Sequence, residues 1–261
     1  MTYDIILMLL LSGIVVGVIN TLAGGGTVIT MTVFMVLGLP ITIANGTNRI
    51  AVVMQNLAAT VTFIRKRMFD VKSSLLLAVP VIIGNICGSL LATHITDTVF
   101  RICFGVVLFL ILIYMIFDNH KRFHPVESMK IKPMHYFWFL LIGFYGGYIY
   151  IGLGYLILAI SLWSMKLDLV TANILKGIVL CVAMPFSMVV FMINGHVDYW
   201  FGLIHGAGNM IGAWLASHYC IHWGGRFVKI FTILMVLICF ADLVGIISLQ
   251  TIFSSMLTVC R

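Results

Sequence analysis

The densest polar chemistry of the chain lies in one short segment that ends in an arginine. Two amides, a hydroxyl and a fixed positive charge fall close together at Asn45, Thr47, Asn48 and Arg49. An arginine beside exposed backbone amides at the start of a helix is well suited to bind a small anion. The segment therefore predicts an anion site. The alternative is an interfacial loop whose arginine extends to lipid headgroups.

Glycines supply a second candidate for anion binding. Asn20 precedes a triplet formed by Gly24, Gly25 and Gly26. Successive backbone amides in such a turn form a concave surface that binds anions. Three glycines also permit plain close packing of helices, so both interpretations stay open.

The composition is that of a polytopic membrane protein. Of 261 residues, 62% are hydrophobic and only 9% are charged, whereas soluble domains carry about 25% charged residues. The net charge of +7 does not indicate a nucleic-acid partner, because the lysines and arginines lie in short loops between apolar segments. Their distribution carries information about topology instead.

No pattern of residues predicts an enzyme, a metal site or another cofactor. The six cysteines are scattered singly, without a C-x-x-C pair. No H-E-x-x-H sequence occurs, and no nucleophile stands with a base in a recognisable motif. We therefore expect a protein that is not an enzyme.

The apolar runs of the chain form two groups of five. They cover residues 5–22, 27–38, 47–64, 73–93 and 99–117, and then 135–150, 154–165, 174–193, 199–221 and 227–247. Spanning a bilayer takes about 20 residues, so the second run of each group is short enough to be re-entrant. Each short run ends at a break, Gly38-Leu39-Pro40 or Lys166-Leu167-Asp168.

The two groups match without gaps at an offset of 128 residues. At this offset the glycine turn falls on Gly152 and Gly154, and Asn45 falls on Asn173. Asp70 falls on Asp198, and Lys176 lies one residue from the counterpart of Arg49. A cation after each break predicts two charges near a pseudo-twofold axis, where a transporter holds its substrate.

The basic loops indicate that the repeats are inverted. The loop 65–72 holds four lysines and arginines, whereas its counterpart 194–198 holds none. One loop later the bias reverses, because Arg226 and Lys229 lie in the second repeat. The expected fold is an all-α polytopic membrane protein with two inverted repeats of about five segments each, eight to ten in all. The repeats cover 1–117 and 135–250, joined by a cytoplasmic linker at 118–134 and followed by a tail at 251–261.

The segment GVINTLAGGGTVITMTVFMVLGLPITIANGTNRIAV resembles the amino-terminal signature of the sulfite exporter TauE/SafE family, also called TSUP. That signature is an Asn-Thr-x-Ala-Gly-Gly-Gly turn, then Gly-Leu-Pro, then Gly-Thr-Asn and a basic residue. The second half resembles the family less closely, because it has Asn-Ile-Leu-Lys176-Gly where the family often has Asn-Ala-Thr-Lys-Lys. The resemblance implies an integral membrane transporter for sulfur-containing anions, such as sulfite or organosulfonates, with about eight spans.

Together these features predict a secondary transporter that moves a small anion across the bacterial inner membrane by alternating access. The alternatives are a passive anion channel, a transporter of a non-sulfur organic anion, or a structural membrane subunit. The expected partners are the anionic substrate and the lipid bilayer. A coupling proton, and a second copy of the chain in a homodimer, are further candidates. The predicted substrate-binding residues are Asn20, Gly24, Gly25, Gly26, Asn45, Thr47, Asn48, Arg49, Gly152, Gly154, Asn173 and Lys176.

Overall fold

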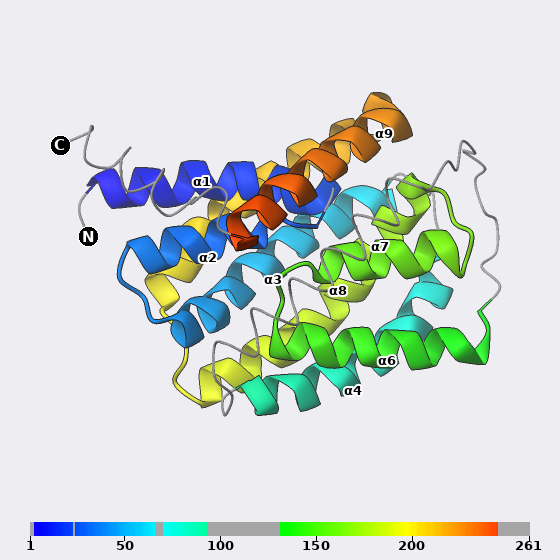
Figure 1. Cartoon of the computed structure of the whole chain (residues 1–261), viewed down its shortest axis with the longest axis horizontal. Helices are drawn as coiled ribbons and strands as arrows, with labels where there is room; N and C mark the ends of the chain where they lie inside the picture. Colours follow the sequence, from blue (N-terminus) through cyan, green and yellow to red (C-terminus); the bar gives the residue numbers. More distant parts are fainter. Residues whose placement is uncertain (1–2, 23, 66–69, 93–130, 245–261) are drawn as a thin grey trace.

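The described part of the chain is entirely helical, and it contains no β-strand. A computed structural model describes residues 3–22, 24–65, 70–92 and 131–244 (Figure 1). Its helices are α1 (Tyr3–Leu22), α2 (Thr27–Val36), α3 (Ile41–Arg65), α4 (Val71–Ala92), α6 (Pro133–Tyr148), α7 (Leu153–Trp163), α8 (Leu169–Ile193) and α9 (Tyr199–Val244). The predicted all-α class is confirmed for these residues. The expected run 99–117, the linker up to residue 130 and the tail 251–261 lie outside them.

Three of the helices are long and apolar enough to cross a membrane. They cover Tyr3–Leu22, Val71–Ala92 and Val170–Ile193. On α4 the large apolar side chains Val79, Ile83 and Leu90 are each more than half exposed. Such a surface is stable in lipid rather than in water, so the chain is a membrane protein.

The two segments that were expected to be short are short helices. α2 has 10 residues and α7 has 11, so at 1.5 Å per residue neither covers a hydrocarbon core of about 30 Å. Each begins after a glycine with a positive φ angle, Gly24 at 99° and Gly152 at 75°. Glycine adopts this backbone conformation without a steric penalty, and it allows the chain to turn between two helices.

The long helices that follow begin earlier than the sequence indicated. The predicted runs started at residues 47 and 174, but α3 begins at Ile41 and α8 at Leu169. Pro40 fits the start of α3 because it lacks the amide proton that a first turn leaves unpaired, and the Asp168 side chain caps α8 by accepting from Val170 N. The segment 45–49 therefore lies inside α3. The expectation of exposed backbone amides beside Arg49 was wrong.

A further difference concerns the last helix. The run predicted at 199–221 and the described part of the run at 227–247, up to residue 244, form one helical element, α9. Figure 1 shows its ribbon rising to the upper right and then turning back towards the centre of the molecule. The sequence places Gly224 and Gly225 between the two runs.

The helices of the two halves follow the predicted offset. α3 and α8 both have 25 residues, and their first and last residues differ by 128 in each case. α4 and α9 also begin 128 residues apart. Asp70 accepts a hydrogen bond from Ser73 N, and Asp198 accepts one from Phe201 N. The matched aspartates thus cap matched helices.

The two halves interlock at glycine contacts. α1 packs against α9, where Gly17 meets the main chain of Asn209. α4 packs against α6, where Gly147 meets the main chain of Asn85. The first helix of each half is therefore held by the fourth helix of the other, which no side-chain pattern had indicated.

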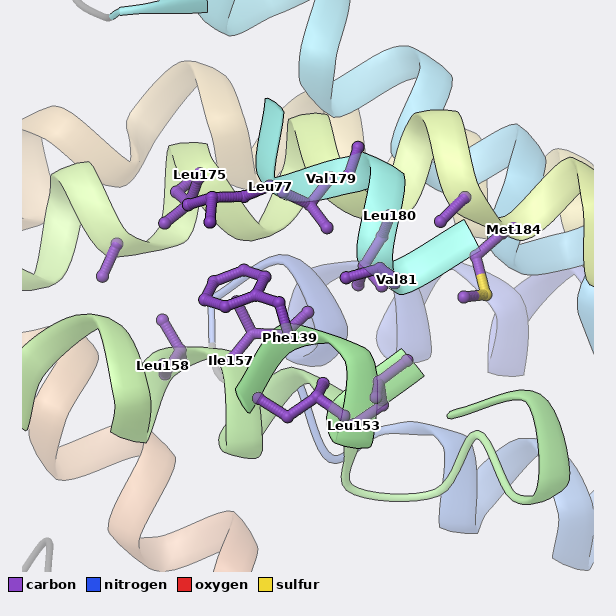
Figure 2. Close-up of a cluster of buried hydrophobic side chains, with 14 of the residues drawn as sticks. Leu77, Val81, Phe139, Leu153, Ile157, Leu158, Leu175, Val179, Leu180 and Met184 are labelled. Carbon is purple, nitrogen blue, oxygen red and sulfur yellow. The ribbon is translucent and has the colours of Figure 1, made fainter. Parts of the chain in front are cut away.

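An apolar core joins α4, α6, α7 and α8. Figure 2 shows the fully buried ring of Phe139, from α6, between side chains of α7 and those of α4 and α8. Its labelled neighbours are Leu77, Val81, Leu153, Ile157, Leu158, Leu175, Val179, Leu180 and Met184. This core fixes the second short helix against the long helix that carries Lys176.

Candidate functional site

Arg49 lies in the protein interior and does not extend to the membrane surface. Its side chain is fully buried, with no exposed area. Nη1 donates to Gly146 O at 2.7 Å, and Nη2 donates to Gly147 O at 3.0 Å. These carbonyls belong to the last turn of α6, where a helix leaves oxygens without internal partners. The interfacial-loop interpretation of Arg49 is therefore wrong.

Aromatic rings and weaker polar contacts complete the surroundings of Arg49. Its guanidinium carbon lies 5.4 Å from the ring centroid of Tyr150 and 5.1 Å from that of Phe191, within the range of cation–π attraction. Nη2 also approaches Asn45 Oδ1 at 3.4 Å, and Nη1 approaches Met184 Sδ at 3.8 Å. Every one of these partners is neutral, and Nε has no partner among the described residues.

Lys176 makes the corresponding set of contacts in the other half. Its side chain is only 3% exposed, and Nζ donates to Asn20 O and Thr21 O at 3.0 Å each. The third bond runs to Asn173 Oδ1 at 2.7 Å. An ammonium group has three donors, so these three acceptors match its full donor capacity.

The two cations form what we call reciprocal clasps. Arg49 of the first half binds the end of α6 in the second half, and Lys176 of the second half binds the end of α1 in the first. Each clasp places a positive charge at the carboxyl end of a helix, where the backbone dipoles favour it. Asn45 and Asn173, which match at the 128 offset, accept from their own cation in each case.

The glycine turns meet one another between the clasps. A Cβ atom on Gly154 would lie 2.6 Å from Gly24 Cα, and a Cβ on Gly24 would lie 2.7 Å from Gly154 Cα. Gly25 lies against the hydroxyl of Tyr155. The predicted residues 24, 25 and 154 are therefore brought together, with close packing at their contact.

Both short helices start at this contact without a side-chain cap. Their N-cap residues are Gly26 for α2 and Gly152 for α7. A glycine N-cap offers no side-chain oxygen to the first amides of a helix, so the positive ends of two helix dipoles face the region of the turns.

Several buried polar atoms of α1, α2 and α3 have no partner among the described residues. Both amide atoms of Asn48 are of this kind, although its side chain is only 1% exposed. Asn20 Oδ1 and Thr27 Oγ1 share this property, and Asn20 Oδ1 would lie 3.1 Å from a Cβ on Gly26. Most buried polar groups in proteins are hydrogen-bonded, so a ligand could supply the bonds that these atoms lack.

One predicted residue lies away from this group. Thr47 Oγ1 accepts from Asp198 N at 2.8 Å and so fixes the turn before α9. Its hydroxyl joins α3 to the turn before α9.

Sequence reasoning did not assign Gln55 or Tyr150 to the site, and for His205 it favoured a helix–helix hydrogen bond over a polar lining. Gln55 accepts from Asn20 Nδ2 at 3.2 Å, and Tyr150 stacks on Arg49. His205 of α9 bridges to α1 and α2, with Nδ1 3.0 Å from Leu9 O and Nε2 3.0 Å from Thr30 Oγ1. Gln55 follows Asn48 by seven residues, or about two helical turns, and this spacing was a usable signal for a shared polar face.

Comparisons with known proteins cover nearly the whole chain. The family model described as "Sulfite exporter TauE/SafE" matches residues 9–243. A probable membrane transporter protein of Sinorhizobium sp. is 26% identical over 243 residues, which is 88% of each chain. One from Haemophilus influenzae is 24% identical over 246 residues, covering 89% of this chain and 91% of the relative. YfcA of Escherichia coli K12, also described as a probable membrane transporter protein, is 22% identical over 82% of this chain and 80% of its own. No solved structure matches the chain with significance.

Proposed function

The chain belongs to the sulfite exporter TauE/SafE family of membrane transporters, and from that premise we propose that it moves a small anion, sulfur-containing as in the family description, across the membrane by alternating access. The observation that carries the proposal is the pair of buried cations at the junction of the two halves. Arg49 is fully buried, and all of its acceptors are neutral. A buried charge without a counter-ion is costly, and an anionic substrate would offset that cost.

The polarity of the backbone favours the same sign of ligand. α2 and α7 direct their uncapped amino ends at the glycine turns, where Gly24 and Gly154 touch. Helix amino ends bind anions through free amides and the helix dipole. Paired broken helices of this kind hold substrates in transporters with inverted repeats.

The proposed site consists of donors and small polar groups around those turns. Arg49 supplies its remaining donor, Nε, and Asn48 supplies an amide with no other partner among the described residues. The remaining proposed contacts are Asn20, Thr27 and the backbone at residues 24–26 and 152–154. Asn45, Asn173 and Lys176 hold this arrangement in place through the clasps.

Alternating access follows if the halves are inverted and rock about the turns. Figure 1 draws α1 from left to right and its counterpart α6 from right to left, and α3 and α8 also run in opposite directions. The end of α3, the start of α4, the start of α6 and the bend of α9 gather on the right in this view. The basic loops flank these same ends, which supports a cytoplasmic location for them and an inner-membrane orientation.

Topology is tested with single cysteines in a variant that lacks the native ones. Lys72→Cys and Lys132→Cys lie at the proposed cytoplasmic end and Asn194→Cys at the other, and all three positions are exposed. In intact cells, a membrane-impermeant thiol reagent should label Asn194→Cys and spare the other two. Equal labelling of Lys72→Cys and Asn194→Cys would contradict the inverted arrangement.

The site itself is tested with Asn48→Leu. Because Asn48 has no partner in the described structure, an apolar side chain of similar size should leave the thermal stability unchanged or raise it. Loss of one bond from an anion costs roughly 1.5–3 kcal/mol, so the affinity for sulfite in a thermal-shift titration should fall at least about tenfold. Ser217→Ala serves as the control, since in the described structure its hydroxyl bonds Trp214 O on the same helix. Unchanged affinity in Asn48→Leu would refute this site.

A further inference from the structure

The two clasps differ in the chemistry of the cation that forms them. A guanidinium keeps its charge in proteins, whereas a lysine ammonium readily loses a proton when its surroundings change. Arg49 is therefore a permanent clasp, whereas the Lys176 clasp can open when the ammonium loses a proton. No feature of the bonding geometry demands this difference, because both cations bind two consecutive carbonyls at a helix end.

The Lys176 clasp joins α8 of the second half to the end of α1 in the first. Its two carbonyl partners, Asn20 O and Thr21 O, form the last turn of α1, directly before the glycine turn. Asn20 is also tied to α3, through the bond from its side-chain amide to Gln55. A change at Lys176 is thereby transmitted to α1, to α3 and to the start of α2.

We propose that Lys176 is the residue that binds and releases the coupling proton of this transporter. The proposal rests on the transport function above and adds to it the energy source and the group that senses it. The coupled ion is a proton. The group that senses it is the Lys176 ammonium of α8, which binds the end of α1 in the other half.

The proton step has a defined consequence for the bonds. The ammonium form has three N–H donors for three acceptors, namely Asn20 O, Thr21 O and Asn173 Oδ1. When it gives one proton to water, the amine keeps two N–H bonds and a lone pair. Two acceptors at most then receive a hydrogen bond, and the lone pair repels the oxygen it faces. The bond to Asn173 is the shortest and lies within α8, so an α1 carbonyl is the acceptor that is released.

Among the side chains that the structure describes, the other titratable groups on the packed helices do not replace Lys176 in this role. Arg49 of α3 lies at the end of α6 and does not titrate, and the phenol of Tyr155 on α7 contacts Gly25. His205 of α9 bridges to Leu9 O and Thr30 within the α1–α2 side and does not cross to α8. Lys72 and Cys87 on α4 are exposed, and the only titratable groups of α1, Tyr3 and Asp4, stand at its far end from the clasp.

The proton alone is a sufficient probe. Proteoliposomes of the full chain are adsorbed to a solid-supported membrane and given rapid pH jumps with no transportable anion present. Wild-type protein should give a transient charge displacement as Lys176 takes up or releases its proton. Lys176→Arg and Lys176→Gln, neither of which titrates there, should abolish it, whereas Ser217→Ala, which changes only a hydroxyl bonded to Trp214 O on the same helix in the described structure, should retain it. Size-exclusion profiles and thermal unfolding establish which variants are folded.

Every outcome of this experiment decides the proposal. It is overturned if the wild type shows no displacement, or if the displacement survives in whichever of the two Lys176 variants folds. Sulfite exchange at equal pH, measured on the same wild-type liposomes, tests the transport function separately. Exchange without a pH-jump signal would refute only the role of Lys176. A signal lost in Lys176→Arg, without any anion exchange, would refute only the anion assignment.

Discussion

The Arg49 and Lys176 clasps both bind carbonyl groups at the carboxyl end of a helix, but they do so with different side chains. Each closes the carboxyl end of a first helix from the opposite half, and each is buried. Arg49 does so between two aromatic rings and keeps one donor, Nε, without a partner in the described residues. Lys176 matches its three donors with three acceptors. The first clasp is therefore suited to bind a ligand and the second to respond to a proton.

The difference also shows in the register of the two halves. Lys176 is the counterpart of Asn48 at the 128 offset, and Arg49 is the counterpart of Gly177. In the first half, Arg49 binds the helix end and the neighbouring Asn48 does not. In the second half, Lys176 occupies the position of Asn48 and binds the helix end itself. Asn48, freed from the clasp, is the residue whose amide has no partner in the described structure. This division explains why the proposed substrate contacts are concentrated in the first half.

The largest expected effect comes from removing either cation. Arg49→Ala and Lys176→Ala should each lower the free energy of unfolding by about 3–6 kcal/mol, since two or more charge-assisted bonds of about 1.5–3 kcal/mol are lost. Denaturant unfolding of the purified protein in mild detergent measures both. Equal stability of Arg49→Ala and wild type would contradict a stabilising role for the Arg49 clasp.

A middle-sized effect is expected from copying the second clasp into the first half. Arg49→Gly alone removes the arginine clasp. The double variant Asn48→Lys/Arg49→Gly gives α3 the Lys-Gly pattern found at 176 and 177. If the halves are equivalent, the double variant should recover roughly 1.5–3 kcal/mol of stability relative to Arg49→Gly. A double variant less stable than Arg49→Gly would show that the two helix ends do not correspond.

The smallest expected effect is the difference in stability cost between replacing Asn173 and replacing Asn45. Asn173 Oδ1 lies 2.7 Å from Lys176 Nζ, whereas Asn45 Oδ1 lies 3.4 Å from Arg49 Nη2. Short charge-assisted bonds are the stronger ones, so Asn173→Ala should cost about 1 kcal/mol more than Asn45→Ala. The same unfolding assay compares them. The reverse order would mean that the bond from Asn45 Nδ2 to Tyr148 O matters more than the contact with Arg49.

The features that depend on residue type and spacing could be predicted from the sequence. The glycine turns, the matched asparagines and the short helices all follow from residue type and the 128 offset. The clasps could not be predicted, because their acceptors are main-chain carbonyls of Asn20, Thr21, Gly146 and Gly147, and any residue type supplies such an oxygen. The start of α3 was placed too late because glycine and polar residues lower helix propensity, whereas close packing of Gly46 against the main chain of His196 stabilises the helix there.

Counterflow of sulfite tests the central claim most directly. Wild-type proteoliposomes are loaded with unlabelled sulfite and diluted into a trace of labelled sulfite at equal pH on both sides. An alternating-access transporter should accumulate label transiently in the loaded liposomes and little in liposomes loaded with chloride, and Asn48→Leu should lower this accumulation at least about tenfold. Label that enters equally whatever the liposomes contain would indicate a passive channel. No exchange of sulfite or of organic sulfonates would contradict the proposed function.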